Sequence, residues 1–255
     1  MIGTAIILAA GRGRRMGTET ADKPKCLAEL LGRPLISWQT GALQSAGIKD
    51  IITIGGYHSE YLSSYTNVAF INRRWEETNM VATLAAAASR LQEKPCLVSY
   101  SDIVYHPKTV LALSETPGDI VISYDLLWLF LWRDRFEDPL DDAETFISKD
   151  GCLVEIGSKP DSLEEIQGQY MGLLKFTPKG WRQTKNLLQS FPQELQDRID
   201  MTSLLRFLIE DKTIVTTVPI KGRWCEVDRL KDRTVYERRI KEGNWSHDWR
   251  WSGKE

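Results

Sequence analysis

The sequence predicts an α/β protein whose mostly parallel mixed sheet is flanked by helices. Short apolar segments alternate with helical patterns through the first half of the chain, in the order of repeated β-α-β units. The opening segment, residues 4–10, is almost continuously apolar, as a strand buried on both faces requires. A stretch rich in glycine and arginine follows it at residues 11–17. The chain has 255 residues, enough for one large domain or two small ones.

The elements of the first half follow in order. Pro34 begins a predicted helix that ends before Gly47, the order of proline and glycine typical of helix ends. Residues 78–93 are rich in Ala and Leu and predict a second helix. A further short helix is predicted at residues 107–113. The strands predicted for this half are residues 50–54, 68–71, 96–100 and 119–124.

The second half is more mixed. Strands are predicted at residues 151–156, 169–176 and 213–219, and helices at residues 178–189, 202–210 and 230–241. We divide the chain into a single domain, residues 1–243, with halves at 1–123 and 124–243, and a tryptophan-rich tail, residues 244–255. The tail has no hydrophobic period, so the sequence leaves open whether it packs on the body or on a partner.

Composition excludes several classes of protein. Lys and Arg number 33 against 35 Asp and Glu, which argues against a nucleic-acid partner. No apolar run approaches 18 residues, so no membrane-spanning helix is expected, and the first residues lack the features of a signal peptide. The four cysteines are far apart and form no C-x-x-C pair, which favours a reducing, cytoplasmic setting. A homodimer is left open.

The loop after the first strand predicts a polyphosphate site. Glycines let the backbone approach a ligand, and arginines donate paired hydrogen bonds to phosphate oxygens. The Walker pattern fails because no Lys-Ser or Lys-Thr follows Gly17, and the dinucleotide pattern fails because Met16 replaces its last glycine. An exposed basic turn without a ligand is the alternative. The loop residues assigned to nucleotide binding are Leu8, Ala9, Ala10, Gly11, Arg12 and Gly13.

Two distant segments predict a metal site. Asp102 follows the strand at residues 96–100, at the edge of a parallel sheet where ligands bind. Glu226 and Asp228 belong to a W-C-E-V-D stretch before the last helix. Carboxylates together with phosphate oxygens and water suit Mg²⁺, so we expect Asp102 and Asp228 as ligands, with Glu226 as a third ligand or a neighbour of them. Capping of the following helices is the alternative role for both aspartates.

A family resemblance sharpens these expectations. Leu-Ala-Ala-Gly-x-Gly-x-Arg-Met at residues 8–16, followed by Lys-Pro-Lys-x-Leu at residues 23–27, resembles the signature of the sugar-phosphate nucleotidyltransferase superfamily. The resemblance implies a Rossmann-like (GT-A-like) nucleotidyltransferase fold and an Mg²⁺-dependent enzyme. It implies that Arg15 holds the β- and γ-phosphates and that Lys25 neutralises the α-phosphate in the transition state. Ser101 is assigned to the nucleotide site.

The nucleotide is predicted to be CTP. The spacing of Asn72 and Asn79-Met80 before a helix resembles the cytidylyltransferase branch, which assigns Asn79 to the nucleotide, although a plain helix cap is an equally good interpretation. On this basis residues 1–123 form the nucleotide-binding half and residues 124–243 the acceptor-binding half.

The acceptor half contains an unusual aromatic segment. Trp128 and Trp132 share one helix face, next to Asp125 and Arg135. The pattern indicates either a buried aromatic stripe or an acceptor pocket for an ammonium or an anionic group.

Further acceptor residues follow from resemblance to cytidylyltransferases of phosphonate and capsule-modification pathways. It implies that Lys159 approaches the transferred phosphate and that Glu144 and Tyr170 contact the acceptor. The predicted reaction transfers CMP from CTP to a small phosphate or phosphonate acceptor of the phosphoglutamine, phosphocholine or alkylphosphonate type, releasing pyrophosphate. The alternatives are a sugar-1-phosphate nucleotidyltransferase that uses UTP or dTTP, and a non-catalytic nucleotide-binding homologue.

Overall fold

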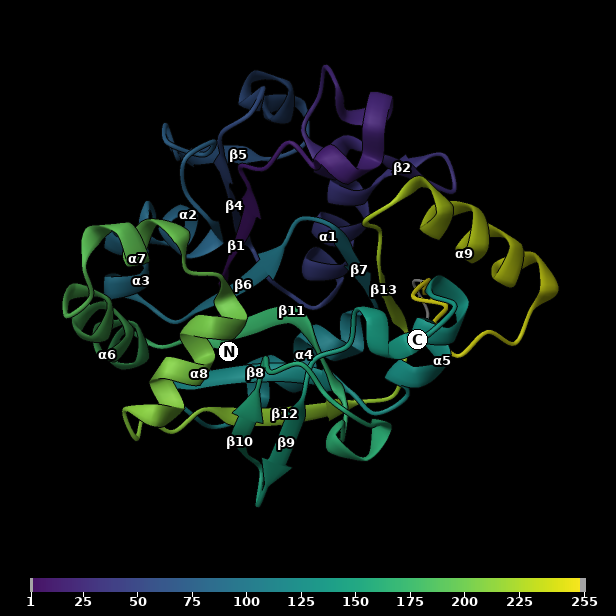
Figure 1. The fold of residues 1–255 in the computed structure, drawn as a ribbon. Coiled ribbons are helices and arrows are strands. Elements are labelled where there is room, and N and C mark those ends of the chain that lie inside the picture. The colour runs from purple at the N-terminus through teal and green to yellow at the C-terminus, as the bar shows by residue number, and fades with distance from the viewer. Residues whose placement is uncertain (1, 253–255) are drawn as a thin grey trace.

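One sheet organises the molecule. The computed structural model describes residues 2–252, so residue 1 of the predicted domain and residues 253–255 of the predicted tail lie outside it. The strands of the sheet are β1 Thr4–Ala9, β4 Asp50–Gly55, β5 Asn67–Ile71, β6 Cys96–Tyr100, β8 Ile120–Asp125, β9 Phe146–Lys149, β10 Cys152–Ile156, β11 Gln169–Phe176 and β12 Thr216–Ile220. Within residues 2–252 their spatial order is β5-β4-β1-β6-β11-β8-β12-β10-β9 (Figure 1).

The sheet is mixed but mostly parallel. Pairing is parallel from β5 through β4 and β1 to β6, and again between β8 and β12. Strand β11 runs antiparallel to both β6 and β8, and β10 runs antiparallel to β12 and β9. The carboxyl ends of β1, β6 and β8 therefore meet at one edge. The predicted fold class is confirmed.

Helices cover both faces of the sheet. They are α1 Leu35–Ser45, α2 Met80–Ala85, α3 Ala88–Glu93, α4 Pro107–Glu115, α5 Trp128–Arg135, α6 Pro178–Gln189, α7 Gln193–Arg198, α8 Met201–Glu210 and α9 Leu230–Glu242. Alternate side chains of β1 divide the core: Ala5 and Ile7 pack with residues of α1, α4, α5 and α9, whereas Ile6 packs with residues of α2, α3, α6 and α8. In Figure 1, α5 and α9 lie to the right and α3 and α6 to the left.

Two short ribbons lie outside the main sheet. Strand β7, Ile103–Tyr105, pairs antiparallel with β13, Trp224–Glu226. Strand β2, Glu29–Leu30, pairs with β3, Arg33–Pro34. The sequence analysis predicted none of these four strands, nor β9 and α7.

The predicted helix at residues 78–93 is two helices, α2 and α3, which meet at a turn around Ala86 and Ala87. The other predicted helices and strands differ from the observed ones mainly by a few residues at their ends.

The described part of the tail packs on the body, which settles that open question. Trp249 is completely buried, and the indole Nε1 of Trp251 donates a hydrogen bond of 3.1 Å to Ser45 Oγ on α1. Across residues 2–252, the helices fall short of the length and hydropathy needed to cross a lipid bilayer.

Candidate active site

A tight turn brings the glycine- and arginine-rich loop after β1, the predicted phosphate loop, against Lys25. Gly13 has φ +70°, and a Cβ there would lie 2.6 Å from Lys25 Cγ. The Gly13 carbonyl oxygen accepts hydrogen bonds from Met16 N at 3.0 Å and Thr20 Oγ1 at 2.9 Å, which fixes the turn. Only glycine fits this position, because it combines the left-handed conformation with a close approach.

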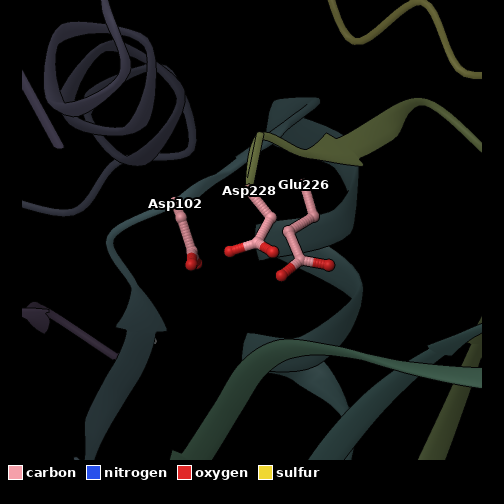
Figure 2. A group of neighbouring side chains, drawn as sticks. All are labelled: Asp102, Glu226 and Asp228. Carbon is pink, nitrogen blue, oxygen red and sulfur yellow. The ribbon is translucent and has the colours of Figure 1, made fainter. Parts of the chain in front are cut away.

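Three carboxylates converge beyond the end of β6. Oxygen atoms of Asp102, Glu226 and Asp228 lie within 4.8 Å of one another (Figure 2). The β7–β13 ribbon creates this convergence: Glu226 pairs with Ile103, and Val227 N donates a hydrogen bond of 2.8 Å to Asp102 O. We call β7, β13 and the adjoining Asp102, Val227 and Asp228 the carboxylate ribbon.

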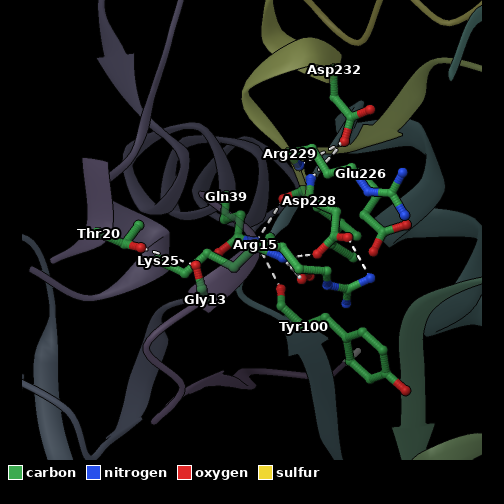
Figure 3. Close-up of polar contacts among 12 residues, drawn as sticks. Gly13, Arg15, Thr20, Lys25, Gln39, Tyr100, Glu226, Asp228, Arg229 and Asp232 are labelled. Carbon is green, nitrogen blue, oxygen red and sulfur yellow. Dashed lines mark hydrogen bonds and ion pairs between the residues drawn. The ribbon is translucent and has the colours of Figure 1, made fainter. Parts of the chain in front are cut away.

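The Lys25 ammonium lies between two of these carboxylates. Its Nζ is 2.6 Å from Asp102 Oδ2. It is also 2.6 Å from Asp228 Oδ1, and Figure 3 shows these two side chains facing each other. Burial favours the neutral amine, but the charges of Asp102, Asp228 and Glu226 outweigh it and raise the pKa of Lys25 above its usual value. The more exposed Arg15 reaches the same cluster, with Nη1 at 2.5 Å from Asp228 Oδ2.

The two aspartates are not helix caps. His106 caps α4, with its Nδ1 accepting a hydrogen bond of 3.0 Å from Lys108 N. At the start of α9, Asp232 Oδ2 accepts from Asp228 N at 2.8 Å and from Arg229 N at 2.9 Å. The side chains of Asp102 and Asp228 therefore do not cap these helices and belong to the carboxylate cluster.

Arg135 supports the cluster from behind. Its buried guanidinium is 3.0 Å from Glu226 Oε2 and 3.4 Å from Asp232 Oδ1. Burial raises the pKa of Glu226, and Arg135 opposes that rise. The structure corrects the assignment of Arg135 to the acceptor, because the residue is buried and its Nε and Nη1 already donate to two carboxylates.

A pocket opens beside the carboxylates. It is lined by Leu8, Ala10, Gly11, Lys25, Trp75, Thr78, Asn79, Met80, Thr83, Tyr100, Ser101 and Asp102. Five residues predicted to bind the nucleotide, Leu8, Ala10, Gly11, Asn79 and Ser101, are among them. Sequence reasoning missed Trp75, Thr83 and Tyr100, for which no motif gave a signal.

Among the residues predicted to contact the nucleotide, Ala9 and Arg12 do not line the pocket, and Asn79 has a second role. The side chain of Ala9 is in the core, and its assignment to the nucleotide stays a prediction that concerns its backbone. The guanidinium of Arg12 lies 5.6 Å from the ring centre of Tyr57, next to the loop. Asn79 caps α2, with its Oδ1 accepting from Met80 N at 2.7 Å, and it lines the pocket as well.

Comparisons with known proteins decide the family. A family model described as a MobA-like NTP transferase domain matches residues 5–141. The chain belongs to this family. The CTP:phosphoglutamine cytidylyltransferase of Campylobacter jejuni is 35% identical over 247 residues, covering 91% of this chain and 98% of that relative. The resemblance to nucleotidyltransferases and their cytidylyltransferase branch is confirmed, and the protein is a nucleotidyltransferase.

Solved structures agree on the fold. The inositol-1-phosphate CTP transferase from T. maritima superposes with a TM-score of 0.73 at 19% identity, covering 95% of this chain and 97% of that one. The CTP:phosphocholine cytidylyltransferase from Streptococcus pneumoniae gives 0.68 at 18% identity, covering 93% and 99%. At these identities the likeness concerns the fold of the MobA-like transferase alone.

The carboxylate cluster of this nucleotidyltransferase fits a hard divalent cation. All three groups offer carboxylate oxygen, the donor that Mg²⁺ prefers. Within the described residues, Asp102 Oδ1 is buried and has no hydrogen-bond partner. Such an acceptor is costly unless a cation or donor reaches it.

The aromatic segment of the transferase belongs to the core. Trp128 and Trp132 are each 4% exposed and pack in the hydrophobic cluster, so the buried-stripe interpretation holds. Asp125 is completely buried, and its oxygens accept hydrogen bonds from Leu127 N, Gly222 N, Trp224 Nε1 and His247 Nε2. The structure therefore corrects the acceptor assignments of Asp125, Trp128 and Trp132.

Two acceptor assignments in this nucleotidyltransferase, Glu144 and Tyr170, and the catalytic assignment of Lys159 stay predictions. The ring of Tyr170 lies edge-on to Tyr100, with centres 5.8 Å apart, and Tyr100 lines the pocket. Burial and the nearby charge of Asp200 raise the pKa of Glu144. The Lys159 ammonium donates a hydrogen bond to the Leu140 carbonyl oxygen.

Proposed function

We propose that this nucleotidyltransferase transfers CMP from CTP to a small phosphate or phosphonate acceptor and releases pyrophosphate. The observation that carries the proposal is the convergence of Arg15 and Lys25 with Asp102 and Asp228, beside a pocket that Lys25 and Asp102 line. A relative that spans nearly the whole of both chains, the CTP:phosphoglutamine cytidylyltransferase, supports CTP as the nucleotide and phosphoglutamine as the first acceptor to test.

Positioning and charge neutralisation account for the chemistry. An oxygen of the acceptor's phosphate or phosphonate is already an anion, so it attacks the α-phosphorus without a general base. A bond forms from that oxygen to the α-phosphorus as the bond to the bridging oxygen breaks, and pyrophosphate leaves with the electron pair. Lys25 is placed to neutralise charge on the α-phosphate and Arg15 charge on the leaving phosphates.

We extend the proposal to Mg²⁺, with Asp102 and Asp228 as ligands and Glu226 as a third ligand or a neighbour of them. When bound, the ion neutralises phosphate charge and orients the nucleotide. Because Lys25 bridges both aspartates in this structure, its ammonium must move when a cation and a triphosphate arrive. Movement toward the α-phosphate is the direction that its proposed role requires.

The acceptor is proposed to lie on the side of Tyr170 and Glu144. Tyr100 joins that side to the nucleotide pocket, because its ring contacts Tyr170 and also lines the pocket. The carboxylate of Glu144 suits the ammonium group that phosphocholine, aminoalkylphosphonates and phosphoglutamine share. Lys159 is proposed to approach the transferred phosphate.

Pyrophosphate release tests the function. CTP, UTP and dTTP are each combined with phosphoglutamine, phosphocholine, 2-aminoethylphosphonate and glucose-1-phosphate, and the Lys25→Met variant serves as the control with a strongly reduced rate. We expect release with CTP and one of the first three acceptors. Preference for UTP or dTTP with glucose-1-phosphate contradicts the proposal, and nucleotide binding without release with any acceptor identifies a non-catalytic homologue.

We also propose that the protein works in the cytoplasm. All four cysteines of the chain are free thiols, and three of them, Cys26, Cys96 and Cys225, are buried. Thiols persist unpaired in a reducing compartment. Thiol labelling of the protein in intact cells, followed by mass spectrometry, measures their oxidation state.

A further inference from the structure

The C-terminal segment, residues 244–252, packs against the turn that precedes β13 of the carboxylate ribbon. Arg223 N, at the start of β13, donates a hydrogen bond of 2.8 Å to Ser246 O. The preceding Gly222 has φ +62°, and a Cβ there would lie 2.3 Å from the same Ser246 oxygen. Only glycine admits this close approach between the β12–β13 turn and the C-terminal segment. Because β7 and β13 are paired, the segment holds the ribbon at the end away from the carboxylates.

A single buried carboxylate joins the segment to the ribbon. Asp125 Oδ2 accepts a hydrogen bond of 2.8 Å from His247 Nε2 and one of 3.0 Å from Trp224 Nε1. Its Oδ1 accepts from Gly222 N at 2.8 Å and from Leu127 N at 2.9 Å. Asp125 and His247 are both completely buried. All four donors are directed at one charge that solvent does not reach, so loss of any one removes a hydrogen bond that bulk water cannot replace.

Trp224, which bonds to Asp125, is close along the ribbon to the three carboxylates. Trp224 pairs with Tyr105, and two residues further Glu226 pairs with Ile103. Immediately beyond, Val227 N bonds to Asp102 O at 2.8 Å. A slip of β13 against β7 would therefore separate Asp102 from Glu226 and Asp228. The pleat of a strand moves a side chain to the opposite face for each residue of slip.

Aromatic packing fixes the segment on the other side. The Trp249 ring lies 5.7 Å from that of Trp38 on α1 and meets it edge-on. Trp251 lies edge-on to His106, which follows β7, at 6.4 Å. His106 N in turn donates a hydrogen bond of 3.0 Å to Arg223 O. Both strands of the ribbon are thus held by the same C-terminal segment.

We infer that the C-terminal segment is a positioning element of the active site, in which His247 acts through Asp125 and Trp224 to hold the register at which Asp102, Glu226 and Asp228 converge. The inference rests on the proposed function for the cation that this cluster holds. His247 belongs neither to the pocket lining nor to the carboxylate cluster, so it is a positioning residue. A role confined to stability would lower the melting temperature and leave cation affinity and ribbon exchange unchanged while the protein is folded.

The test uses full-length variants at a temperature where each is folded. His247→Leu fills the space but donates no hydrogen bond, whereas His247→Gln keeps an amide donor in place of Nε2. Leu205→Ala is the control, because Leu205 is completely buried in the core on the opposite face of the sheet. Mn²⁺ affinity is measured without nucleotide by electron paramagnetic resonance, and hydrogen exchange is measured on the peptide that contains Val227.

We expect His247→Leu to weaken Mn²⁺ binding about 10-fold, the lower end of what groups supporting metal ligands contribute, and to speed exchange at Val227. Gln at this position should restore both, and Leu205→Ala should change neither. Normal affinity and exchange in His247→Leu, or equal losses in Leu205→Ala, overturn the inference. If the wild type releases no pyrophosphate from CTP, the proposed function fails. Hydrogen exchange at Val227 still tests the positioning role in that case.

Discussion

The ammonium of Lys25 lies 2.6 Å from Oδ1 of Asp228, although 203 positions separate the two residues in the chain. Arg15 reaches the second oxygen of the same carboxylate. Asp228 therefore holds together the phosphate loop and the carboxylate ribbon before any substrate arrives. This arrangement keeps the Lys25 ammonium charged, and it directs both cations at the position where phosphates are proposed to bind.

Replacement of Lys25 should separate its two roles. We expect Lys25→Met to lower the rate of pyrophosphate release about 100- to 1,000-fold, the effect of losing one transition-state donor. The same variant should bind Mn²⁺ more tightly without nucleotide, because an ammonium no longer competes for Asp102 and Asp228. Lys149→Met, at an exposed lysine on β9, is the matched control. An unchanged rate in Lys25→Met would remove this residue from the mechanism.

Asp102 offers a direct test of the cation site. Asp102→Asn keeps the shape of the side chain but removes its charge, so the Mg²⁺ concentration for half-maximal rate should rise about 10- to 100-fold. The control is Asp150→Asn, because Asp150 is exposed in a turn with φ +51°, a conformation that asparagine tolerates. Identical Mg²⁺ titrations for the two variants would show that Asp102 is not a ligand.

Gly13 should be required for activity beyond its effect on stability. In Gly13→Ala, the new methyl group would displace Lys25, since a Cβ lies 2.6 Å from Lys25 Cγ. Gly47→Ala shares the strain of a positive φ, +85°, but meets no atom within 4 Å. Both variants should lose about 1–2 kcal/mol of stability in urea unfolding. Only Gly13→Ala should lose kcat, and a normal kcat there would show that Lys25 can relocate without cost.

The stability of the protein should respond to pH through Glu144. Burial and Asp200 raise its pKa, so its contribution to stability is fully present below about pH 4.5 and is lost as pH rises through the folded-state pKa. Glu144→Gln should therefore be more stable than the wild type at pH 7, by about 0.5–2 kcal/mol, and equally stable at pH 4. Urea unfolding at the two pH values measures the difference. If Glu144→Gln were less stable than the wild type at pH 7, the predicted direction of the stability change would be wrong. Separately, a raised KM for the acceptor in this variant would support the proposed contact of Glu144 with the acceptor.

Arg135 should matter greatly for stability. Arg135→Met would leave Glu226 and the buried Asp232 without their cation, at a cost of about 3–5 kcal/mol. Arg133→Met, an exposed neighbour on the same helix, is the control and should cost less than about 0.5 kcal/mol. Comparable urea midpoints for the two variants would show that the ion pairs contribute little.

The part of the site that could be predicted consists of residues that are close together in the sequence. The apolar β1, the glycine turn after it and Lys25 lie within 22 residues of chain. The glycines and arginines of the turn favour a phosphate loop, and the resemblance to nucleotidyltransferases adds Lys25 to it. Asp102 was predictable because it follows a buried strand of a parallel sheet. In each case the residue and the feature that positions it are close in sequence.

The unpredicted part depends on pairing between distant segments. Strands β7 and β13 have three residues each, too few to show a period, and their partners lie more than 100 positions apart. Asp125 and Arg135 were interpreted as free charges for an acceptor. The partner of Asp125, Gly222, lies 97 positions further along the chain, and the partner of Arg135, Glu226, lies 91 positions further. No local sequence pattern predicts these contacts.

Strand β11 has a consequence for how the chain can be divided. It belongs to the second half of the sequence, yet it lies between β6 and β8 and pairs with both. A fragment that stopped at residue 123 would expose the bare edge of β6, and exposed edges invite aggregation. The two halves should be soluble only when they are produced together, because each supplies a strand that the other lacks. The predicted division at 123/124 therefore does not separate independently folding units.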